Sequence, residues 1–475
     1  MDFQGKKVLV FGAGKSGIDS AVLLKQVGAE PFLYDQNQTL AVDEVRGKLS
    51  EAAKQTAGAD SAGIEILLGE LPEDRYASTS LVVMSPGIPC DIPVVERFRS
   101  RGTPVWSEIE LAWRIGKGDV YAVTGTNGKT TTTALLGKIL GDYYPEVYVV
   151  GNIGSPYTGV VLKQTDQAKT VAEVSSFQLE TIDEFHPRVC AITNITEDHL
   201  NRHHTMEEYI RVKERIAENQ TADDLCVLNY EDEILRKFGE NLKSKVVWFS
   251  SRRPLGPGFE FPGGRKNDTG IWVEGGVIRY TENGEVQDLI FTDDMQLLGL
   301  HNFENAMVAA AIALFAGVPQ DRVKESIARF RGVEHRIEYV TEIRGVRYYN
   351  DSKGTNPDAA IKGIQAMNRP TLLIGGGFDK QSTYDDWINS FDGKVKWFVL
   401  IGQTREKIRD TAIACGFPAD RIILCNDLRQ AVGFCAEKAK NGDAVLLSPA
   451  CASWGQFDNF EQRGDLFKQY VMDLF

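Results

Sequence analysis

The chain has 475 residues, a formal net charge of −13 and seven cysteines. Its length predicts about two to four domains, and its negative charge argues against a general nucleic-acid binder or a protein held on anionic membranes. The cysteines form no C-x-x-C pair, no apolar run approaches the roughly 18 residues that span a bilayer, and the N-terminus shows no signal-peptide pattern. We therefore expect a cytoplasmic protein with reduced thiols.

Residues 1–107 alternate between strand and helix patterns and predict a doubly wound α/β domain. The strand pattern Lys7–Phe11 leads into the glycine turn Gly12–Gly17, and a second strand pattern ends at Asp35. A G-x-G-x-x-G turn with an acidic residue about 20 positions on is typical of dinucleotide binding, with the carboxylate on an NAD ribose. Because the same turn binds any pyrophosphate, NAD and other nucleotides both stay open. A later strand pattern ends in a turn at Ser85.

The stretch Val120–Thr133, VYAVTGTNGKTTTT, predicts a strand, a glycine turn and a helix that begins at Lys129. Gly125 and Gly128 allow the backbone to approach a phosphate, and the helix N-terminus points its N–H groups at it. Lys129 would supply charge for the β- and γ-phosphates, and Thr130 a ligand for Mg²⁺. The loop is tighter than the common G-x-x-x-x-G-K-[ST] spacing. We predict an ATP or GTP site; the alternative is a structural turn with a surface lysine.

Polar side chains follow the next three strand patterns. Asn152 stands in a turn at the end of one strand, and Glu173 ends the next. A carboxylate at the end of a buried strand beside a phosphate loop is a usual second anchor for Mg²⁺, whereas the alternative is a solvent-exposed glutamate. His199 follows the third strand and is either a metal ligand or a helix-capping residue.

A helix pattern begins at Thr205 and contains Lys213. Tyr209 and Ile216 stand four residues before and three residues after this lysine, so Lys213 lies on the apolar helix face. One interpretation is a packed stem whose amine reaches water. The other is a buried amine whose pKa is lowered and which is therefore chemically usable.

Residues 250–295 are rich in Gly and Pro and then alternate in polarity, which predicts a small antiparallel β insert. An alanine-rich helix pattern follows. Asn302 and Asn305 are three residues apart on one face of that helix, where they would either bind a planar base or cap and solvate the helix start.

The last segment, residues 333–475, predicts another doubly wound α/β unit. Polar clusters follow its strand patterns, so we expect a binding site at the carboxyl ends of the strands. The expected strands are Val346–Tyr349, Thr371–Ile374, Trp397–Ile401, Arg421–Leu424 and Ala444–Leu447.

These motifs together resemble the Mur ligases over nearly the whole chain. The matching runs, in order, are TGTNGKTT, GNIG, EVSSFQLE, TEDHLNRH, YIRVKERI, LGLHNFENA, EHRIE, NDSKGTNP and SPACASWGQFDNFEQRGDLF. The final run is most similar to the family members that add D-glutamate. Asn201 and Trp454 depart from the pattern, and Trp454 stands beside the expected amino-acid pocket.

The resemblance implies an α/β fold of three domains. Residues 1–107 would form a Rossmann-like domain that binds the UDP end of UDP-MurNAc-L-Ala, which removes the need for NAD. Residues 108–332 would form a P-loop ATPase-like domain with the small β insert, and residues 333–475 a Rossmann-like domain that brings D-glutamate.

The resemblance also implies the site residues. The UDP-substrate positions are Lys15, Ser16, Asp35, Gln36, Ser85, Asn152 and His199. The ATP positions are Gly125, Thr126, Asn127, Gly128, Lys129, Thr130, Thr131, Asn302, Asn305, Arg336 and Asp351. The D-glutamate positions are Thr355, Lys380, Ser453 and Phe460. His335 and Lys353 match further active-site positions.

The implied reaction is ATP-dependent amide formation through an acyl phosphate, in peptidoglycan precursor synthesis. Two Mg²⁺ ions would assist, the first on Thr130 and Glu173 and the second on His199 and Lys213. Lys213 would be carbamoylated, which requires an uncharged amine. The expected catalytic residues are Lys129, Glu173, His199, Lys213 and Lys353. The family suggests a monomer that acts on small molecules and has no nucleic-acid or membrane partner.

Three alternatives remain open at this point. A sibling amide ligase such as a folylpolyglutamate synthase shares the GTNGKT loop. A nucleotide-dependent switch would bind ATP or GTP without making a bond. An NAD-dependent oxidoreductase would use the first glycine turn.

Overall fold

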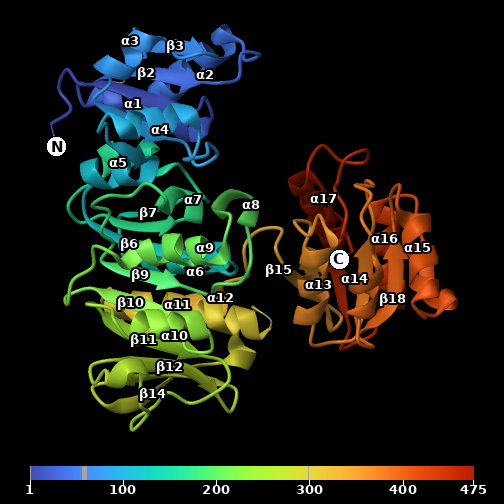
Figure 1. Cartoon of the computed structure of the whole chain (residues 1–475). Helices are drawn as coiled ribbons and strands as arrows, with labels where there is room; N and C mark the ends of the chain where they lie inside the picture. Colours follow the sequence, from blue (N-terminus) through green and yellow to red (C-terminus); the bar gives the residue numbers. More distant parts are fainter. Residues whose placement is uncertain (1, 56–60, 298, 475) are drawn as a thin grey trace. The chain divides into compact units, whose positions relative to one another are not determined.

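The structure is a computed structural model that describes residues 2–55, 61–297 and 299–474 (Figure 1). Strands and helices alternate along the chain, and the strands form three sheets. The chain divides into two compact units, Met1–Leu289 with Glu304–Lys324 and Ile290–Phe303 with Glu325–Phe475. The first sheet and nearly all of the second belong to the first unit, and the third sheet belongs to the second unit. The expected domain limits at 107 and 332 stay predictions.

The first sheet is parallel, with the strand order β3-β2-β1-β4-β5. Alternate residues of its strands face opposite sides, so Val8 packs with α1 and α2 while Leu9 packs with α3 and α4. Its strands are β1 (Lys7–Phe11), β2 (Glu30–Asp35), β3 (Glu65–Leu68), β4 (Leu81–Met84) and β5 (Val105–Ser107). The helices are α1 (Lys15–Gln26), α2 (Val42–Gln55), α3 (Glu73–Ser78), α4 (Pro93–Ser100) and α5 (Glu108–Ile115). The polar run 43–60 also predicts a helix; α2 covers its first part, and residues 56–60 lie outside the described part.

The second sheet has nine strands in the order β14-β13-β12-β11-β10-β9-β6-β8-β7. It is parallel from β7 to β12, and β13 pairs antiparallel with β12. The predicted β insert is therefore present, and it extends the edge of this sheet. The strands are β6 (Asp119–Thr124), β7 (Val147–Gly151), β8 (Lys169–Glu173), β9 (Val189–Ile192), β10 (Leu225–Asn229), β11 (Lys245–Ser250), β12 (Thr269–Glu274), β13 (Val277–Glu282) and β14 (Glu285–Phe291). The helices are α6 (Lys129–Gly141), α7 (Ser176–Leu179), α8 (Leu200–His203), α9 (Met206–Glu214), α10 (Glu233–Gly239), α11 (Leu300–Phe315) and α12 (Gln320–Arg329).

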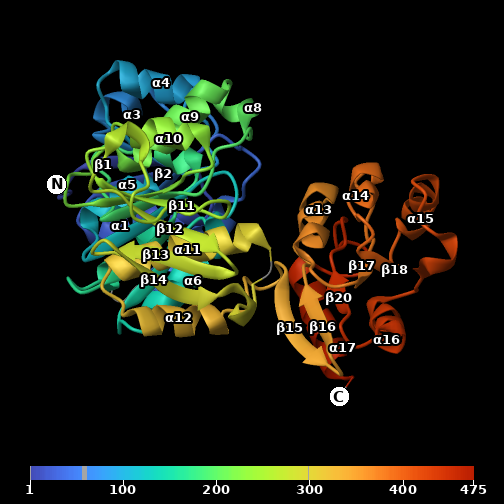
Figure 2. The same ribbon diagram turned by 90° about the horizontal axis from the view of Figure 1, so that it is seen from below.

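The third sheet has the order β15-β16-β20-β17-β18-β19, and only the β15–β16 pair is antiparallel among the pairs described. Figure 2 shows α13, α14 and α15 on one face of this sheet and α16 and α17 on the other, and each face has its own apolar core. The strands are β15 (Glu338–Ile343), β16 (Val346–Asn350), β17 (Thr371–Gly375), β18 (Val395–Leu400), β19 (Ile422–Leu424) and β20 (Ala444–Leu447). The helices are α13 (Pro357–Ala366), α14 (Asp385–Asn389), α15 (Arg405–Ala414), α16 (Leu428–Lys438) and α17 (Phe460–Met472).

The joint between the first two sheets is built around the buried carboxylate of Glu110 on α5. This carboxylate accepts the backbone N–H groups of Asp183 at 2.9 Å, Glu184 at 3.1 Å and Phe185 at 2.8 Å. Arg114 bonds the same carboxylate at 2.6 Å and Asp183 at 2.7 Å. A buried carboxylate with several N–H donors is a fixed anchor, so α5 is tied firmly to the loop that precedes β9.

The loops that carry the predicted site residues follow central strands of each sheet. The glycine turns follow β1 and β6, and each of these strands has parallel neighbours on both sides. In such sheets ligands bind at the carboxyl ends of the strands, where the strand order reverses. In residues 2–55, 61–297 and 299–474, no helix combines the length and the apolarity that a membrane crossing requires.

Candidate active site

The phosphate-binding loop predicted from the sequence joins β6 to α6. The predicted strand, turn and helix are confirmed, and α6 begins at Lys129 with Gly128 as its N-cap. Gly128 has φ +87°, and a Cβ there would lie 2.4 Å from Oδ1 of Asn305. Only glycine fits this position, because a side chain would meet both backbone strain and a steric clash.

Two lysines converge on this loop. Nζ of Lys129 donates to the carbonyl oxygens of Gly125 and Thr126, each at 2.8 Å. Nζ of Lys213, from α9, donates to the same Gly125 oxygen at 2.8 Å. Both lysines thus lie where a bound triphosphate would need positive charge.

The Lys213 side chain is only 2% exposed, and its Nζ lies 4.7 Å from the ring centroid of Tyr209. The alternative in which its amine reaches water is therefore wrong. Burial, with repulsion from Lys129, lowers the pKa of Lys213 to about 7. A substantial fraction of this amine is uncharged at neutral pH.

Glu173 ends β8, beside the strand that leads into the phosphate loop. It is fully buried, so the solvent-exposed alternative is wrong. Its Oε1 accepts a hydrogen bond from Nδ2 of Asn152 at 2.9 Å, and its Oε2 has no hydrogen-bond partner in the described part of the chain. A buried carboxylate oxygen without a partner is costly, so this atom fits a metal ligand.

His199 is the N-cap residue of α8, with φ +53° and no side-chain capping bond. His199 therefore stands at the capping position that the alternative predicted, but its side chain does not cap the helix. Its imidazole is about half exposed and packs on the Phe177 ring, with ring centroids 5.0 Å apart. Its Nε2 lies 3.6 Å from Oδ2 of Asp198.

His203 is a buried residue that the sequence analysis missed. Its Nε2 lies 2.9 Å from Oγ of Ser176, and its ring lies 5.6 Å from Phe177 and 5.3 Å from Tyr209. Burial lowers the pKa of His203. The run HLNRHH contains this histidine, but the spacing of its histidines does not distinguish the buried His203 from the exposed His199 and His204.

The phosphate loop is braced by one residue of α9 and one residue of the loop after β9. Oγ1 of Thr126 lies 3.0 Å from the Tyr209 hydroxyl, and the Asn127 N–H donates to Oδ1 of Asn194 at 2.9 Å. Asn194 was not among the predicted residues, although it follows β9 as Asn152 follows β7. Thr130 is partly buried and Thr131 is buried in the first turn of α6.

Asn302 and Asn305 on α11 are each 5% exposed, so the alternative in which they solvate the helix start is wrong. Oδ1 of Asn305 accepts a hydrogen bond from Oγ1 of Thr132 at 3.2 Å. The structure thus brings Asn305 to the phosphate loop.

The first glycine turn has a tight backbone approach. A Cβ at Gly17 would lie 1.9 Å from the Gly12 carbonyl oxygen. Oδ2 of Asp35 accepts the Ala13 N–H at 2.9 Å, so Asp35 fixes the turn. Oγ of Ser85 is buried and has no hydrogen-bond partner among the residues described, which suits a hydrogen bond to a ligand.

The end of β2 opens onto a cavity of about 540 Å³. Tyr34 and Gln36 line it from β2 and the following turn, and Gly69 and Arg97 contribute from other elements. Lys15 and Ser16 begin α1 after the glycine turn. A cavity of this size accommodates a nucleoside.

The C-terminal site centres on Asp351, which follows β16. Its Oδ2 accepts a hydrogen bond from Oγ of Ser448 at 2.6 Å, and its Oδ1 accepts the Ile337 N–H at 3.3 Å. Burial raises the pKa of Asp351 to about 7, and the charge of Arg336 opposes this rise. The structure therefore brings Asp351 and Arg336 into one electrostatic environment, as a shared site requires.

His335, Lys353 and Phe460 lie together in the same unit. The His335 ring lies 6.0 Å from the Phe460 ring, and Nζ of Lys353 lies 5.8 Å from that ring. The Thr355 N–H donates to the Lys353 carbonyl oxygen at 2.8 Å. The loop after β16 and the start of α17 thus face one another.

Arg463 on α17 holds these loops in place, and the sequence analysis missed it. Its guanidinium donates to Oγ and the carbonyl oxygen of Ser352 at 2.9 and 2.8 Å and to the Cys451 carbonyl oxygen at 3.1 Å. It is fully buried, as is nearly all of Ser453. The loops after β16 and β20 are therefore fixed by one side chain.

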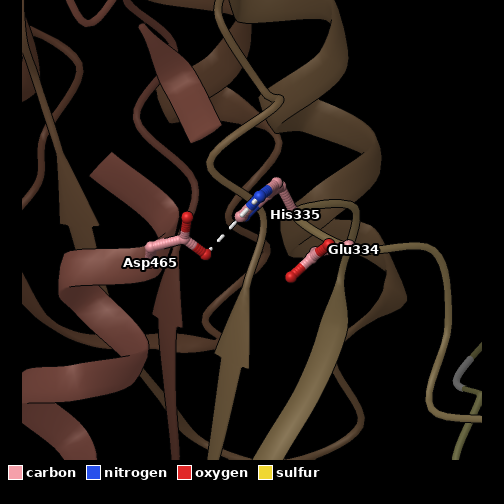
Figure 3. A group of neighbouring side chains, drawn as sticks. All are labelled: Glu334, His335 and Asp465. Carbon is pink, nitrogen blue, oxygen red and sulfur yellow. Dashed lines mark ion pairs between the residues drawn. The ribbon is translucent and has the colours of Figure 1, made fainter. Parts of the chain in front are cut away.

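Glu334, His335 and Asp465 form a cluster whose ligand atoms lie within 4.8 Å of one another (Figure 3). The ammonium of Lys468 contacts Glu334 at 2.5 Å and Asp465 at 3.2 Å. Because this ammonium pairs with both carboxylates, the cluster is an ion-pair network. The predicted magnesium ligands lie elsewhere: Thr130 in α6, Glu173 at the end of β8, His199 at the N-cap of α8 and Lys213 in α9.

Comparisons with known proteins agree with this geometry. Residues 6–107 match a family model described as Mur ligase MurD-like, N-terminal domain. Residues 123–313 match the Mur ligase middle domain, and residues 335–451 match the Mur ligase, glutamate ligase domain.

The chain is 52% identical to a UDP-N-acetylmuramoylalanine–D-glutamate ligase of Lachnospira eligens, with 100% of both chains covered. It is 43% identical to the ligase of the same name from Caldanaerobacter subterraneus, again with 100% of both covered. Among solved structures, the alanine ligase MurC of Thermotoga maritima aligns with a TM-score of 0.56 at 18% identity, covering 99% of this chain and 100% of that one. This last similarity concerns the fold alone.

Proposed function

The chain belongs to the Mur ligase family, and from this premise we propose that it joins D-glutamate to UDP-N-acetylmuramoyl-L-alanine while ATP is converted to ADP and phosphate. The full-length relatives that carry this activity in their name support the substrate assignment. The observation that carries the chemistry is the convergence of Lys129 and Lys213 on the Gly125 carbonyl oxygen, at 2.8 Å each.

The reaction has two steps. The alanyl carboxylate attacks the γ-phosphorus of ATP, which forms an acyl phosphate and releases ADP. The amine nitrogen of D-glutamate then attacks the acyl carbon, loses a proton, and expels phosphate to leave an amide. The first step brings two anions together, so it requires concentrated positive charge. Lys129 and the N-terminus of α6 supply that charge from this chain.

The donor set at the phosphate loop fits magnesium. Oε2 of Glu173 is buried and has no hydrogen-bond partner in the described residues, and Thr130 stands in the first turn of α6. These two residues would hold one ion. His199 and a carbamoylated Lys213 would hold a second. Bound Mg²⁺ would neutralise charge on the phosphates.

Carbamoylation of Lys213 is part of the proposal. The neutral amine attacks CO₂, loses a proton, and becomes a carbamate with two oxygen ligands. The low exposure of Lys213 and its pKa of about 7 support this, because the ammonium form does not react.

We assign the remaining residues by element. Asn305, with Asn302, Arg336 and Asp351, would bind the adenosine of ATP, and Gly125–Thr131 would bind its phosphates. The UDP end of the substrate would occupy the cavity beside Gln36. Its pyrophosphate would be bound by Lys15, Ser16, Asp35 and Ser85. Asn152 and His199 would lie nearer the reacting end of the substrate. D-Glutamate would be held by Thr355, Lys380, Ser453 and Phe460, and Lys353 would act at the reacting groups.

The biological setting follows from the substrates. A ligase that uses ATP and a UDP-linked peptidoglycan precursor works in the cytoplasm, where both are made, and contributes to cell wall growth, cell shape and division. The small substrates require no nucleic-acid or membrane partner, and we propose a monomer.

The test measures phosphate release with ATP, Mg²⁺ and UDP-MurNAc-L-Ala in the presence of D-glutamate, L-glutamate or no amino acid. Turnover with D-glutamate alone supports the proposal. Turnover with a folate and L-glutamate would favour a folylpolyglutamate synthase, and phosphate release that no acceptor stimulates would favour a nucleotide switch. Binding of a nicotinamide cofactor such as NADH would favour the NAD-dependent oxidoreductase alternative.

A further inference from the structure

Two large aromatic side chains lie exposed side by side in the third domain. Phe378 is 37% exposed and Trp454 is 54% exposed, with ring centroids 5.6 Å apart and ring planes at 63°. Phe378 follows β17 and Trp454 follows β20, and the Phe378 N–H donates to the Ala452 carbonyl oxygen at 2.9 Å. The backbone bond fixes the two loops to each other, so the aromatic pair is preorganised.

The ammonium of Lys380 lies over one member of this pair, Trp454. Its Nζ is 5.0 Å from the Trp454 ring centroid. In the part of the chain that the structure describes, no carboxylate lies within ion-pair distance of Lys380, and the adjacent Asp379 pairs with Lys407 at 3.1 Å. The charge of Lys380 is thus held by an indole face instead of a carboxylate.

We propose that Trp454, braced by Phe378, is a positioning residue that holds the Lys380 ammonium ready for a carboxylate of the amino-acid substrate. The proposal rests on the proposed function, in which Lys380 belongs to the D-glutamate pocket. A lysine side chain has four rotatable bonds and loses much freedom when it is fixed. Because the indole restricts the side chain before the substrate arrives, less freedom is lost on binding.

An indole suits this role better than an acidic partner. A carboxylate beside Lys380 would compete with the substrate carboxylate and would repel it. The indole attracts the ammonium without neutralising it, so the full charge remains for the ligand. Ser453, directly before Trp454, is 4% exposed and anchors the loop in the domain.

The test compares KM values of three variants. Trp454→Leu removes the π face, Trp454→Phe keeps it, and Phe291→Leu is a control at an aromatic residue that is also 54% exposed. We expect Trp454→Leu to raise KM for D-glutamate about two- to fivefold, since an exposed cation–π contact contributes about 0.5–1 kcal/mol. KM for ATP and for UDP-MurNAc-L-Ala, and kcat, stay within about 1.5-fold, and Trp454→Phe restores most of the D-glutamate affinity.

A double mutant separates this role from a general effect on the loop. If Trp454 acts through Lys380, Trp454→Leu changes KM for D-glutamate by less than about 1.5-fold in a Lys380→Met background. An equal effect in both backgrounds, an unchanged KM in Trp454→Leu, or a joint rise of all three KM values would overturn the proposal. Absence of D-glutamate-dependent turnover in the unmodified protein would overturn the proposed function itself and this inference with it.

Discussion

Lys129 and Lys213 share one acceptor, the Gly125 carbonyl oxygen, at 2.8 Å each. Two lysines that meet on one oxygen repel one another, and this repulsion adds to burial in lowering the pKa of Lys213. Lys129 of the phosphate loop therefore favours the uncharged form of Lys213, the residue that we propose to be carbamoylated. This coupling leads to the first two predictions.

Lys213→Met should stabilise the protein while abolishing activity. The pKa of Lys213 is about 7 in the folded protein, below the ordinary lysine value of 10.5. Its burial therefore costs stability fully below about pH 7, and the cost disappears as pH rises toward 10.5. We expect a gain on the order of 3 kcal/mol at pH 6.5 that shrinks by pH 10.

Chemical denaturation of both proteins in CO₂-free buffer at pH 6.5, 8 and 10 measures this. Lys237→Met, at a lysine whose side chain is 74% exposed, is the control and should show no such gain. A stability difference that does not change with pH would contradict the pKa argument.

Lys213→Ala should lose at least about 100-fold in kcat and regain part of it with short carboxylic acids. The truncated side chain leaves room beside Gly125, and acetate or formate would replace the carbamate oxygens there. Rates with and without the acids provide the measurement. Rescue by methylamine but not by acetate would show that the amine, not a carbamate, is the working group.

Glu173→Gln should raise the Mg²⁺ concentration needed for half-maximal activity at least about tenfold. The substitution keeps the size of the side chain but removes the charge of Oε2, the oxygen without a hydrogen-bond partner among the described residues. A Mg²⁺ titration of initial rates gives this number. Glu240→Gln, at an exposed carboxylate, is the matched control, and an equal shift in both variants would contradict a metal role for Glu173.

Gly128→Ala should destabilise the protein by about 1–3 kcal/mol and weaken ATP binding. The alanine would need φ +87° and would place Cβ 2.4 Å from Oδ1 of Asn305. Gly433→Ala is the control, because Gly433 lies in α16 with no heavy atom within 4 Å of the added Cβ. Thermal unfolding with and without ATP measures both effects; a Gly128→Ala variant as stable as Gly433→Ala would refute the clash.

The elements of the phosphate loop were predictable from local patterns. Strand and helix periodicity located β6 and α6, and the glycines marked the turn between them. The sequence also predicted which helix face carries Lys213, but it did not predict how fully that face is buried. Burial depends on which residues of distant segments cover the helix, and here Gly125, 88 residues away, is one of them.

The residues that were missed act across long sequence separations. Asn194 bonds the phosphate loop 67 residues away, and Arg463 reaches Ser352 across 111 residues. No spacing rule in one sequence links such pairs. The strands β10 and β11 were also not predicted, although their apolar runs LCVLN and KVVWFS follow the usual pattern of buried strands.

The anchor formed by Glu110 has a consequence for protein engineering. Exchanging the first 107 residues between relatives cuts the chain directly before α5, so the graft would meet a foreign α5. A graft that runs through Arg114 still needs the host loop 183–185 to offer three N–H groups in the same places. The segment to exchange is therefore discontinuous. It comprises the N-terminal part of the chain through α5 together with the loop 183–185, about 70 residues downstream of Glu110.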